Sequence, residues 1–196
     1  FATQYGVPIH VRSSFNDAEG TWVMSEEDIM ERLVVSGVTH KLNEAKIRVK
    51  GVQDHPGIAG KLFEPLSQAG ILIDMIVQNL SSDGTTDMTF TVSRVEYNKA
   101  LEIANAAASE IGASEVEGDQ SIAKISIVGL GMQDHAGVAT RMFTTLASEG
   151  INIQLISTSE IKISVVIEEK YAELALRALH AEFIEDGAAE PVADVR

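Results

Sequence analysis

The chain has 196 residues, enough for one ordinary domain or two small ones, and its 45% hydrophobic residues are enough to form packed cores. With 29 acidic and 15 basic side chains its formal charge is −14, which argues against partners such as nucleic acid or an anionic membrane surface. The absence of cysteine excludes disulfides and thiolate chemistry, and the lack of a long apolar run or a signal sequence favours a cytoplasmic protein without a membrane span.

The first 44 residues read as the end of another domain followed by a linker. Val7, Ile9 and Val11 alternate with other residues as a strand does, and a polar turn follows at 13–17. A lone strand is not stable, so residues 1–23 are predicted to complete a larger domain. The acidic run at 26–28 is typical of the first turn of a helix, and residues 24–44 are predicted to form a linker helix.

A repeat fills the chain from about residue 45 onward. The segment Lys50–Ala59 recurs as Leu130–Ala139, and both copies contain Gln-Asp-His-x-Gly at an offset of 80 residues, from Gln53 to Gln133. The same offset relates Phe63 to Phe143, Leu66 to Leu146, Gly70 to Gly150, Ile71 to Ile151 and Ile73 to Ile153. The sequence therefore predicts two copies of one unit, at 45–118 and 119–196.

Each copy has the same succession of elements. An alternating strand is followed by an amphipathic helix that ends at Gly70 or Gly150, where a left-handed residue commonly closes a helix. Short apolar runs at 71–77 and 151–156 predict second strands, and alternating residues at 88–92 and 161–167 predict third strands. Second helices are predicted at 97–111 and 171–183.

This succession predicts an α+β fold of two ferredoxin-like βαββαβ units in tandem, each with helices on one sheet face. The last strands are ambiguous, because residues 114–117 lead through Gly118-Asp119-Gln120 almost directly into Ile122–Val128, which is hairpin spacing. We therefore predict that the second unit is inserted in the first by exchange of the last strands. Residues 114–117 would complete the second unit, and 191–196 would return to the first.

The repeated motif lies where a strand leads into a helix. A helix N-terminus offers unpaired N–H groups and partial positive charge, which suit a carboxylate or a phosphate. Capping by the aspartate and a tight turn at the glycine would explain the same residues without any ligand. Because the pattern occurs twice, two explanations remain open. The motif has either a ligand or interface role, or only the role of capping the helix.

Other site chemistry has little support in the sequence. Gly129-Leu130-Gly131 lacks the third glycine and the acidic residue of a dinucleotide fingerprint. His55 and His135 have no second histidine at helical spacing, so no metal site is predicted. An acylphosphatase-like enzyme of the same fold is disfavoured, because no arginine follows Gly51-Val52-Gln53 before Arg94.

Longer motifs resemble the ACT domains of aspartate kinases. Asp54-His55-Pro56-Gly57, followed by the segment 73–81, resembles the first such domain, and the segment 152–165 resembles the second. Residues 5–9 and 13–16 resemble the end of the amino-acid-kinase catalytic domain. The resemblance covers nearly the whole chain, with 42–196 as the regulatory region, and Met30 is placed like the internal start of a separate β subunit.

The resemblance implies feedback inhibition by threonine, lysine or both in the lysine, threonine and methionine pathway. The parent enzyme would phosphorylate L-aspartate to 4-phospho-L-aspartate with ATP and Mg, and this chain alone would be regulatory, with no catalytic residue and no cofactor. The expected partners are a second copy of the chain, forming a homodimer through the ACT units, and the catalytic α subunit. The alternative is a tandem ACT module that dimerises and binds no effector.

The resemblance also implies a set of effector-binding residues. In the first unit these are Asp54, His55, Pro56, Gly57, Ile58, Ala59, Leu72, Ile73, Asp74 and Gln78, and in the second Val138, Ala139, Asn152, Ile153, Ser159 and Glu160. Helix N–H groups would bind the carboxylate of a free amino acid, and Gln78 would recognise a side-chain hydroxyl. Leu72 stands where the second copy has Asn152, whereas the family often has asparagine at both, so the two units need not bind ligand equivalently.

Overall fold

The computed structural model describes residues 2, 5, 7–23, 34–81, 84–129, 132 and 135–185. Outside the sheet of the repeats, a small hairpin pairs β1 with β2, which confirms the strand predicted near residue 9. None of the described helices is long and apolar enough to span a membrane. The elements are β1 (Ile9–Val11), β2 (Thr21–Val23), β3 (Gly37–Gln53), α2 (Ile58–Gln68), β4 (Ile73–Leu80), β5 (Thr85–Ser93), α3 (Tyr97–Glu110), β6 (Glu115–Val128), α4 (Val138–Ser148), β7 (Leu155–Thr158), β8 (Lys162–Glu168), η3 (Glu169–Tyr171), α5 (Ala172–His180) and η4 (Ala181–Glu185).

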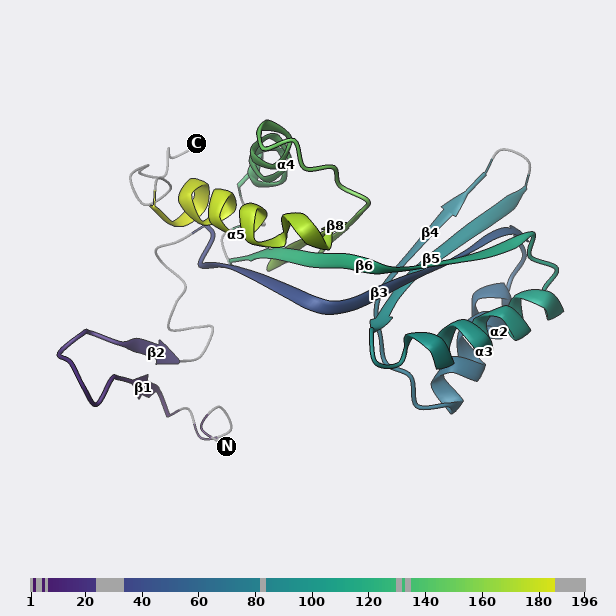
Figure 1. Ribbon diagram of the computed structural model, residues 1–196, viewed down its shortest axis with the longest axis horizontal. Coiled ribbons are helices and arrows are strands. Elements are labelled where there is room, and N and C mark those ends of the chain that lie inside the picture. The colour runs from purple at the N-terminus through teal and green to yellow at the C-terminus, as the bar shows by residue number, and fades with distance from the viewer. Residues whose placement is uncertain are drawn as a thin grey trace.

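One antiparallel sheet joins the two repeats, with the strand order β4-β5-β3-β6-β8-β7. Its two central strands, β3 and β6, are long enough to belong to both repeats, and they lie side by side along the middle of the molecule (Figure 1). Helices α2 and α3 lie at one end of these strands, and α4 and α5 lie at the other (Figure 1). The α+β class and the two ferredoxin-like units are therefore confirmed.

The first unit contains its own fourth strand. The second half of β3 pairs with β5 on one side and, at Lys46–Lys50, with the first half of β6 on the other. The prediction that residues 114–117 complete the second unit is wrong. Gly118 pairs with Ile47 and is not among the glycines with a left-handed backbone, so no hairpin turn forms there and β6 continues unbroken into the second unit.

The second unit takes its fourth strand from upstream of the first. Gly37–Lys41, the first half of β3, pairs with Lys124–Val128 of β6. The units are thus interleaved, as predicted, but the first is inserted in the second. Residues 37–44 form strand rather than linker helix, while 24–33 and 191–196 lie outside the described residues. The boundary at residue 118 stays a prediction.

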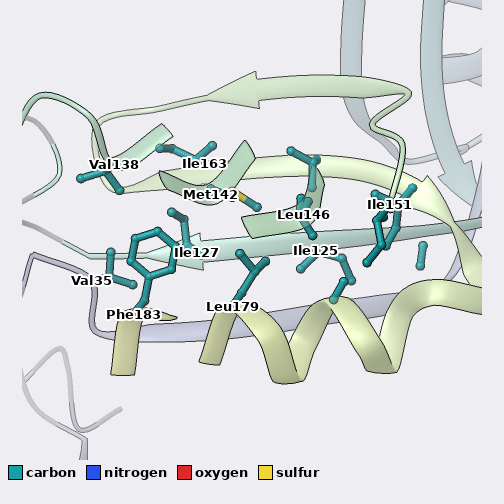
Figure 2. Close-up of a cluster of buried hydrophobic side chains, with 14 of the residues drawn as sticks. Val35, Ile125, Ile127, Val138, Met142, Leu146, Ile151, Ile163, Leu179 and Phe183 are labelled. Carbon is teal, nitrogen blue, oxygen red and sulfur yellow. The ribbon is translucent and has the colours of Figure 1, made fainter. Parts of the chain in front are cut away.

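Each helix pair covers its own apolar core. The first core lies under α2 and α3 and includes Ile47, Leu62 and Phe90. The second core lies under α4 and α5, and its members Val35, Ile127, Met142, Leu179 and Phe183 converge between the sheet and α5 (Figure 2). Val35 and Phe183 lie at the same end of this core, so a residue upstream of β3 packs inside the second unit (Figure 2).

Irregularities in the central strands keep all four helices on one side of the sheet. The pairing of β3 with β6 shifts between Lys41 and Glu44 and again between Glu44 and Lys46. Each shift adds a residue to one strand and so reverses the face to which the following side chains point. As a result Val38 and Ile47 of β3, which pack against the two different cores, lie on the same sheet face. We call the opposite side of the sheet the inner face. The sheet curls toward this face, because its edge strands β4 and β7 contact each other.

The backbone of Gly118 leaves no room for a larger residue. A Cβ atom at this position would lie 1.9 Å from the hydroxyl oxygen of Tyr97, whose ring is buried. We expect Gly118→Ala to lower the free energy of unfolding by about 1–3 kcal/mol, the usual cost of overpacking. Gly37→Ala is the matched control in β3, because a Cβ there meets nothing within 4 Å. Urea unfolding of both variants checks this, and equal stabilities would contradict the packing described.

Candidate functional site

The repeated motif precedes an uncapped helix in both units. Helix α2 has Gly57 as its N-cap, with φ at 91° and no hydrogen bond from a capping side chain, and Gly137 before α4 has φ at 98° and likewise no cap. Asp54 therefore does not cap α2, which removes the capping explanation of that residue. Glycine is favoured at both positions because of the left-handed backbone. The Ile58 amide donates to the carbonyl oxygen of His55 at 3.2 Å. A Cβ atom added at Gly57 or Gly137 would meet nothing within 4 Å, so there is space beside each glycine.

Hydrogen bonds tie the loop 54–57 to the end of the β4–β5 hairpin. The amide of Asp54 donates to the carbonyl oxygen of Gly84 at 3.1 Å. The carboxylate of Asp87 accepts a hydrogen bond from the Gly51 amide at 2.9 Å and forms an ion pair with Arg48 at 2.6 Å. The hydrogen bond from the Gly51 amide is the main cause that holds the pKa of Asp87 below its ordinary value, and the hydrogen bond from Arg48 is the second. The loop is thus fixed at the end of β3 from which α2 begins.

The predicted residues of this loop differ in what they offer a ligand. Asp54, His55 and Pro56 have exposed side chains. Ile58 is buried in the first core and Ala59 packs against it, so both can offer only backbone groups. In the second unit Val138 and Ala139 occupy the same positions against the second core. His135 is described there, whereas Gln133 and Asp134 lie outside the described residues.

Gln78 lies at the same end of the sheet as the loop. It pairs with Met88 of β5, which is buried in the first core, and directly opposed cross-strand residues share a sheet face. Its exposed side chain is therefore on the helix-covered side of the edge strand β4, two residues before that strand ends at Leu80. The structure thus brings Gln78 and the start of α2 to one corner of the first unit.

Leu72, Ile73 and Asp74 lie at the other end of β4. Leu72 is 80% exposed, and Ile73 packs against the first core. A bulge between Ile73 and Ile76 turns Asp74 to the inner face, where Lys124 donates a hydrogen bond to it and the Nζ of Lys41 is 3.7 Å from its Oδ2. Asp74 and Gln78 of one chain therefore do not face a common ligand.

The equivalent segment of the second unit is also remote from the loop at residue 54. Asn152 is exposed, Ile153 packs against the second core, and Gln154 accepts a hydrogen bond from Lys46 of β3. Lys46 precedes Gln53 by seven residues, or roughly 20 Å along a strand. Ser159 and Glu160 lie still further along, in the β7–β8 turn, where the Ser159 amide donates to Lys162 at 2.7 Å.

The inner face carries charged residues that the sequence alone did not identify. Glu44 is 1% exposed, forms an ion pair with Lys41, and has no hydrogen-bond partner for its Oε2 within the described part of the chain. Lys46 and Lys124 also point to this face. Strand alternation indicated an uncovered face, but nothing in the sequence showed which residues meet there. Within the described ranges, no three histidine or acidic side chains form a candidate metal site.

The charge of Asp74 depends on its lysine partners. Burial alone would raise the pKa of Asp74, but the Lys124 hydrogen bond and the charges of Lys124, Lys41 and Lys162 together hold it below its ordinary value. A carboxylate whose pKa is lowered by folding stabilises the folded state above its ordinary pKa, and this contribution is lost as the pH falls through the folded value.

We therefore expect Asp74→Asn to lower stability at pH 7 by up to about 1 kcal/mol, since the side chain is one-third exposed. The difference from the unaltered chain should shrink as the pH falls below the ordinary pKa of an aspartate, because the contribution is lost on protonation of Asp74. Asp17→Asn, in the exposed β1–β2 connection, is the control and should show no such difference at any pH. Urea unfolding at pH 7, 5 and 3 measures this, and a difference that grows in acid would contradict the assignment.

Comparison with known proteins places both units in one family. A family model described as ACT domain matches residues 47–107 and 125–183. The chain is 54% identical over 195 residues to "Aspartate kinase Ask_LysC" of Stutzerimonas stutzeri, covering 99% of this chain and 47% of that protein. It thus spans about half the length of the curated relatives it matches.

Solved structures match the repeats with the same architecture. One, described as aspartokinase alpha and beta subunits, is 52% identical with a TM-score of 0.72, covering 76% of this chain and 98% of that one. The ligand-free regulatory subunit of aspartate kinase from Thermus thermophilus is 43% identical with a TM-score of 0.72, covering 76% and 99% of the two chains. The chain therefore belongs to the aspartate kinase family, as a regulatory, β-subunit-like region with two ACT domains.

Proposed function

We propose that this chain binds threonine, with lysine as a co-effector, and thereby mediates feedback inhibition of aspartate phosphorylation. The parent enzyme would use ATP and Mg to convert L-aspartate to 4-phospho-L-aspartate, in a catalytic domain to which residues 1–23 contribute the end. This chain alone would have no kinase activity. The observation that carries the proposal is the start of α2, which no side chain caps, with left-handed Gly57 at the same end of the sheet as the exposed Gln78.

The chemistry of this corner suits a neutral amino acid with a hydroxyl group. Backbone N–H groups at the start of α2 would bind the carboxylate, because a helix N-terminus favours negative charge. Gln78 would exchange hydrogen bonds with the hydroxyl of threonine, since its amide can both donate and accept. Asp54 supplies a carboxylate at the same loop for the ammonium group.

The site is proposed to be shared between two chains. Asn152 and Ile153 of the same chain lie near the opposite end of β4, so only a second copy can offer them to the loop at Asp54–Ala59. The edge strand β4 supports such pairing, because Leu72, Ile76 and Leu80 are 80%, 54% and 68% exposed and an open apolar edge invites another strand. We propose a homodimer through these edges, which the catalytic α subunit would join.

Calorimetry with the full chain tests the proposal. Threonine is expected to bind, lysine to bind or to alter threonine affinity, and serine and alanine to bind more weakly, because each lacks part of the threonine side chain. Sedimentation at micromolar concentration should show a dimer that threonine tightens. A dimer that binds neither threonine nor lysine would establish the alternative, a dimerisation module without effector.

A further inference from the structure

Two equivalent positions in the repeats are held by lysines of the opposite unit. At the offset of 80 residues, Asp74 corresponds to Gln154. Lys124, which lies on the strand that opens the second unit, donates a hydrogen bond to Asp74 of the first. Lys46, on the first strand of the first unit, donates to Gln154 of the second. The start of each edge strand is therefore held across the junction between the units, Asp74 within β4 and Gln154 directly before β7.

The repeat itself does not account for this reciprocity. At the same offset Lys46 corresponds to Ser126, and Lys124 corresponds to Glu44. Two lysines from non-equivalent positions thus reach equivalent targets. The lysine side chains are 21% and 10% exposed. If its segment moved alone, Lys124 would leave a largely desolvated ammonium group without the Asp74 carboxylate, and Lys46 would keep only Asp119, whose Oδ2 is 3.8 Å from its Nζ.

An apolar cluster connects the two fastened segments. Met75, directly after Asp74, packs with Ile122, Val166 and Leu155, and Leu155 directly follows Gln154. The edge strands that contain Met75 and Leu155 contact each other, and the strands that contain Lys46 and Lys124 are paired. The hydrogen bonds, the apolar cluster and the central strands therefore form a closed ring around the inner face.

The ring joins 152–153, to which the proposed function gives a ligand role, to 72–74, the equivalent segment of the first unit, which the resemblance also includes among the effector-binding residues. A shift of either segment must displace its own lysine contact and the shared cluster, and through the cluster it must affect the other segment. Contiguous packing of this kind carries coupling when both sites bias the same arrangement.

We propose that Lys46 and Lys124 are positioning residues that couple the effector segments of the two ACT units within one chain, so that a change at one segment shifts the other. The ligand role of these segments rests on the proposed function, but the coupling between them is a property of the chain without ligand. Coupling of this kind is reciprocal, so each segment must respond to a change at the other.

Hydrogen exchange of the full ligand-free chain tests the coupling. We expect Lys46→Met to speed amide exchange roughly two- to thirtyfold in segment 151–157, which it contacts, and also in 71–77, which it does not. Lys124→Met should affect both segments as well. Lys50→Met is the matched control, because Lys50 lies on β3 with Lys46 but pairs with Glu115 and Glu117 of the first unit. It should leave both segments unchanged.

Further measurements separate positioning from a general loss of stability. Exchange in helices α3 and α5 should stay unchanged in the methionine variants, and Lys46→Arg and Lys124→Arg should restore slow exchange because they keep the charge. If a methionine variant does not fold, Lys→Gln replaces it. The proposal is overturned if each variant affects only the segment that its own lysine contacts, or if α3 and α5 exchange equally faster.

Added threonine distinguishes this proposal from the proposed function. In the unaltered chain, threonine should slow exchange in both segments. In Lys46→Met it should slow exchange at 151–157, which contains the proposed contacts Asn152 and Ile153, by a larger factor than at 71–77. If threonine and lysine do not bind, the proposed function fails, and the ligand-free exchange still decides the coupling. Equal protection of both segments in Lys46→Met would contradict the coupling even though the effector binds.

Discussion

A chain that starts at residue 43 is expected to lose the second ACT unit while the first stays folded. It would lack Gly37–Lys41, which pairs with Lys124–Val128, and Val35, which is buried in the second core. Loss of the buried valine and of the strand pairing should together destabilise the second unit by at least about 3 kcal/mol. Hydrogen exchange in α4 and α5 should approach that of an unfolded segment, while α2 and α3 stay protected.

A chain that starts at residue 34 is the control for this truncation. It lacks the β1–β2 hairpin but keeps Val35, the hydrogen bond from the Ser36 amide to Val128 at 2.7 Å, and the whole of β3. Both units should stay folded. If the two shortened chains protected α4 and α5 equally, Gly37–Lys41 would not be the fourth strand of the second unit.

Replacing Gln78 should have the largest effect of any single side chain on effector binding. Removing one hydrogen bond to a buried polar group costs about 1–3 kcal/mol, so Gln78→Ala should weaken threonine binding by roughly five- to a hundredfold. Because the site is proposed to need two chains, threonine should also shift the dimerisation constant by the factor that links binding to association. Calorimetry and sedimentation measure the two effects.

Asn79→Ala is the control for Gln78→Ala. Asn79 is the next residue of β4 and pairs with Asp87, so its side chain points to the opposite sheet face from Gln78. Its replacement should leave threonine affinity unchanged within about a factor of two. Equal affinities for the unaltered chain and Gln78→Ala would refute the proposed position of the hydroxyl group.

The repeat made most of the fold predictable. It predicted two copies, their helices and the glycines that precede and end the first helix of each, because these features depend on local periodicity and backbone preference. It failed at the junction, where Gly118-Asp119-Gln120 has turn composition but continues as a strand. There Gly118 pairs with Ile47 of β3 and lies against Tyr97 at the start of α3, and these tertiary contacts do not follow from the local turn composition.

The candidate site was predictable only in part. The start of α2 and Gln78 were identified from motifs, and the structure brings them to one corner. Asp74 was grouped with them, but a bulge between Ile73 and Ile76 turns it to the inner face. Lys46 and Lys124 were not identified, because their partners are 108 and 50 residues away and depend on the curl of the sheet.

A crystal structure of the full chain grown with threonine tests the central claim most directly. We expect one threonine at the interface of two chains, with its carboxylate on the backbone amides near Gly57–Ala59, its hydroxyl at Gln78, and Asn152 and Ile153 of the partner chain closing the site. Threonine enclosed within one chain, or bound away from both Gly57 and Gln78, would contradict the claim.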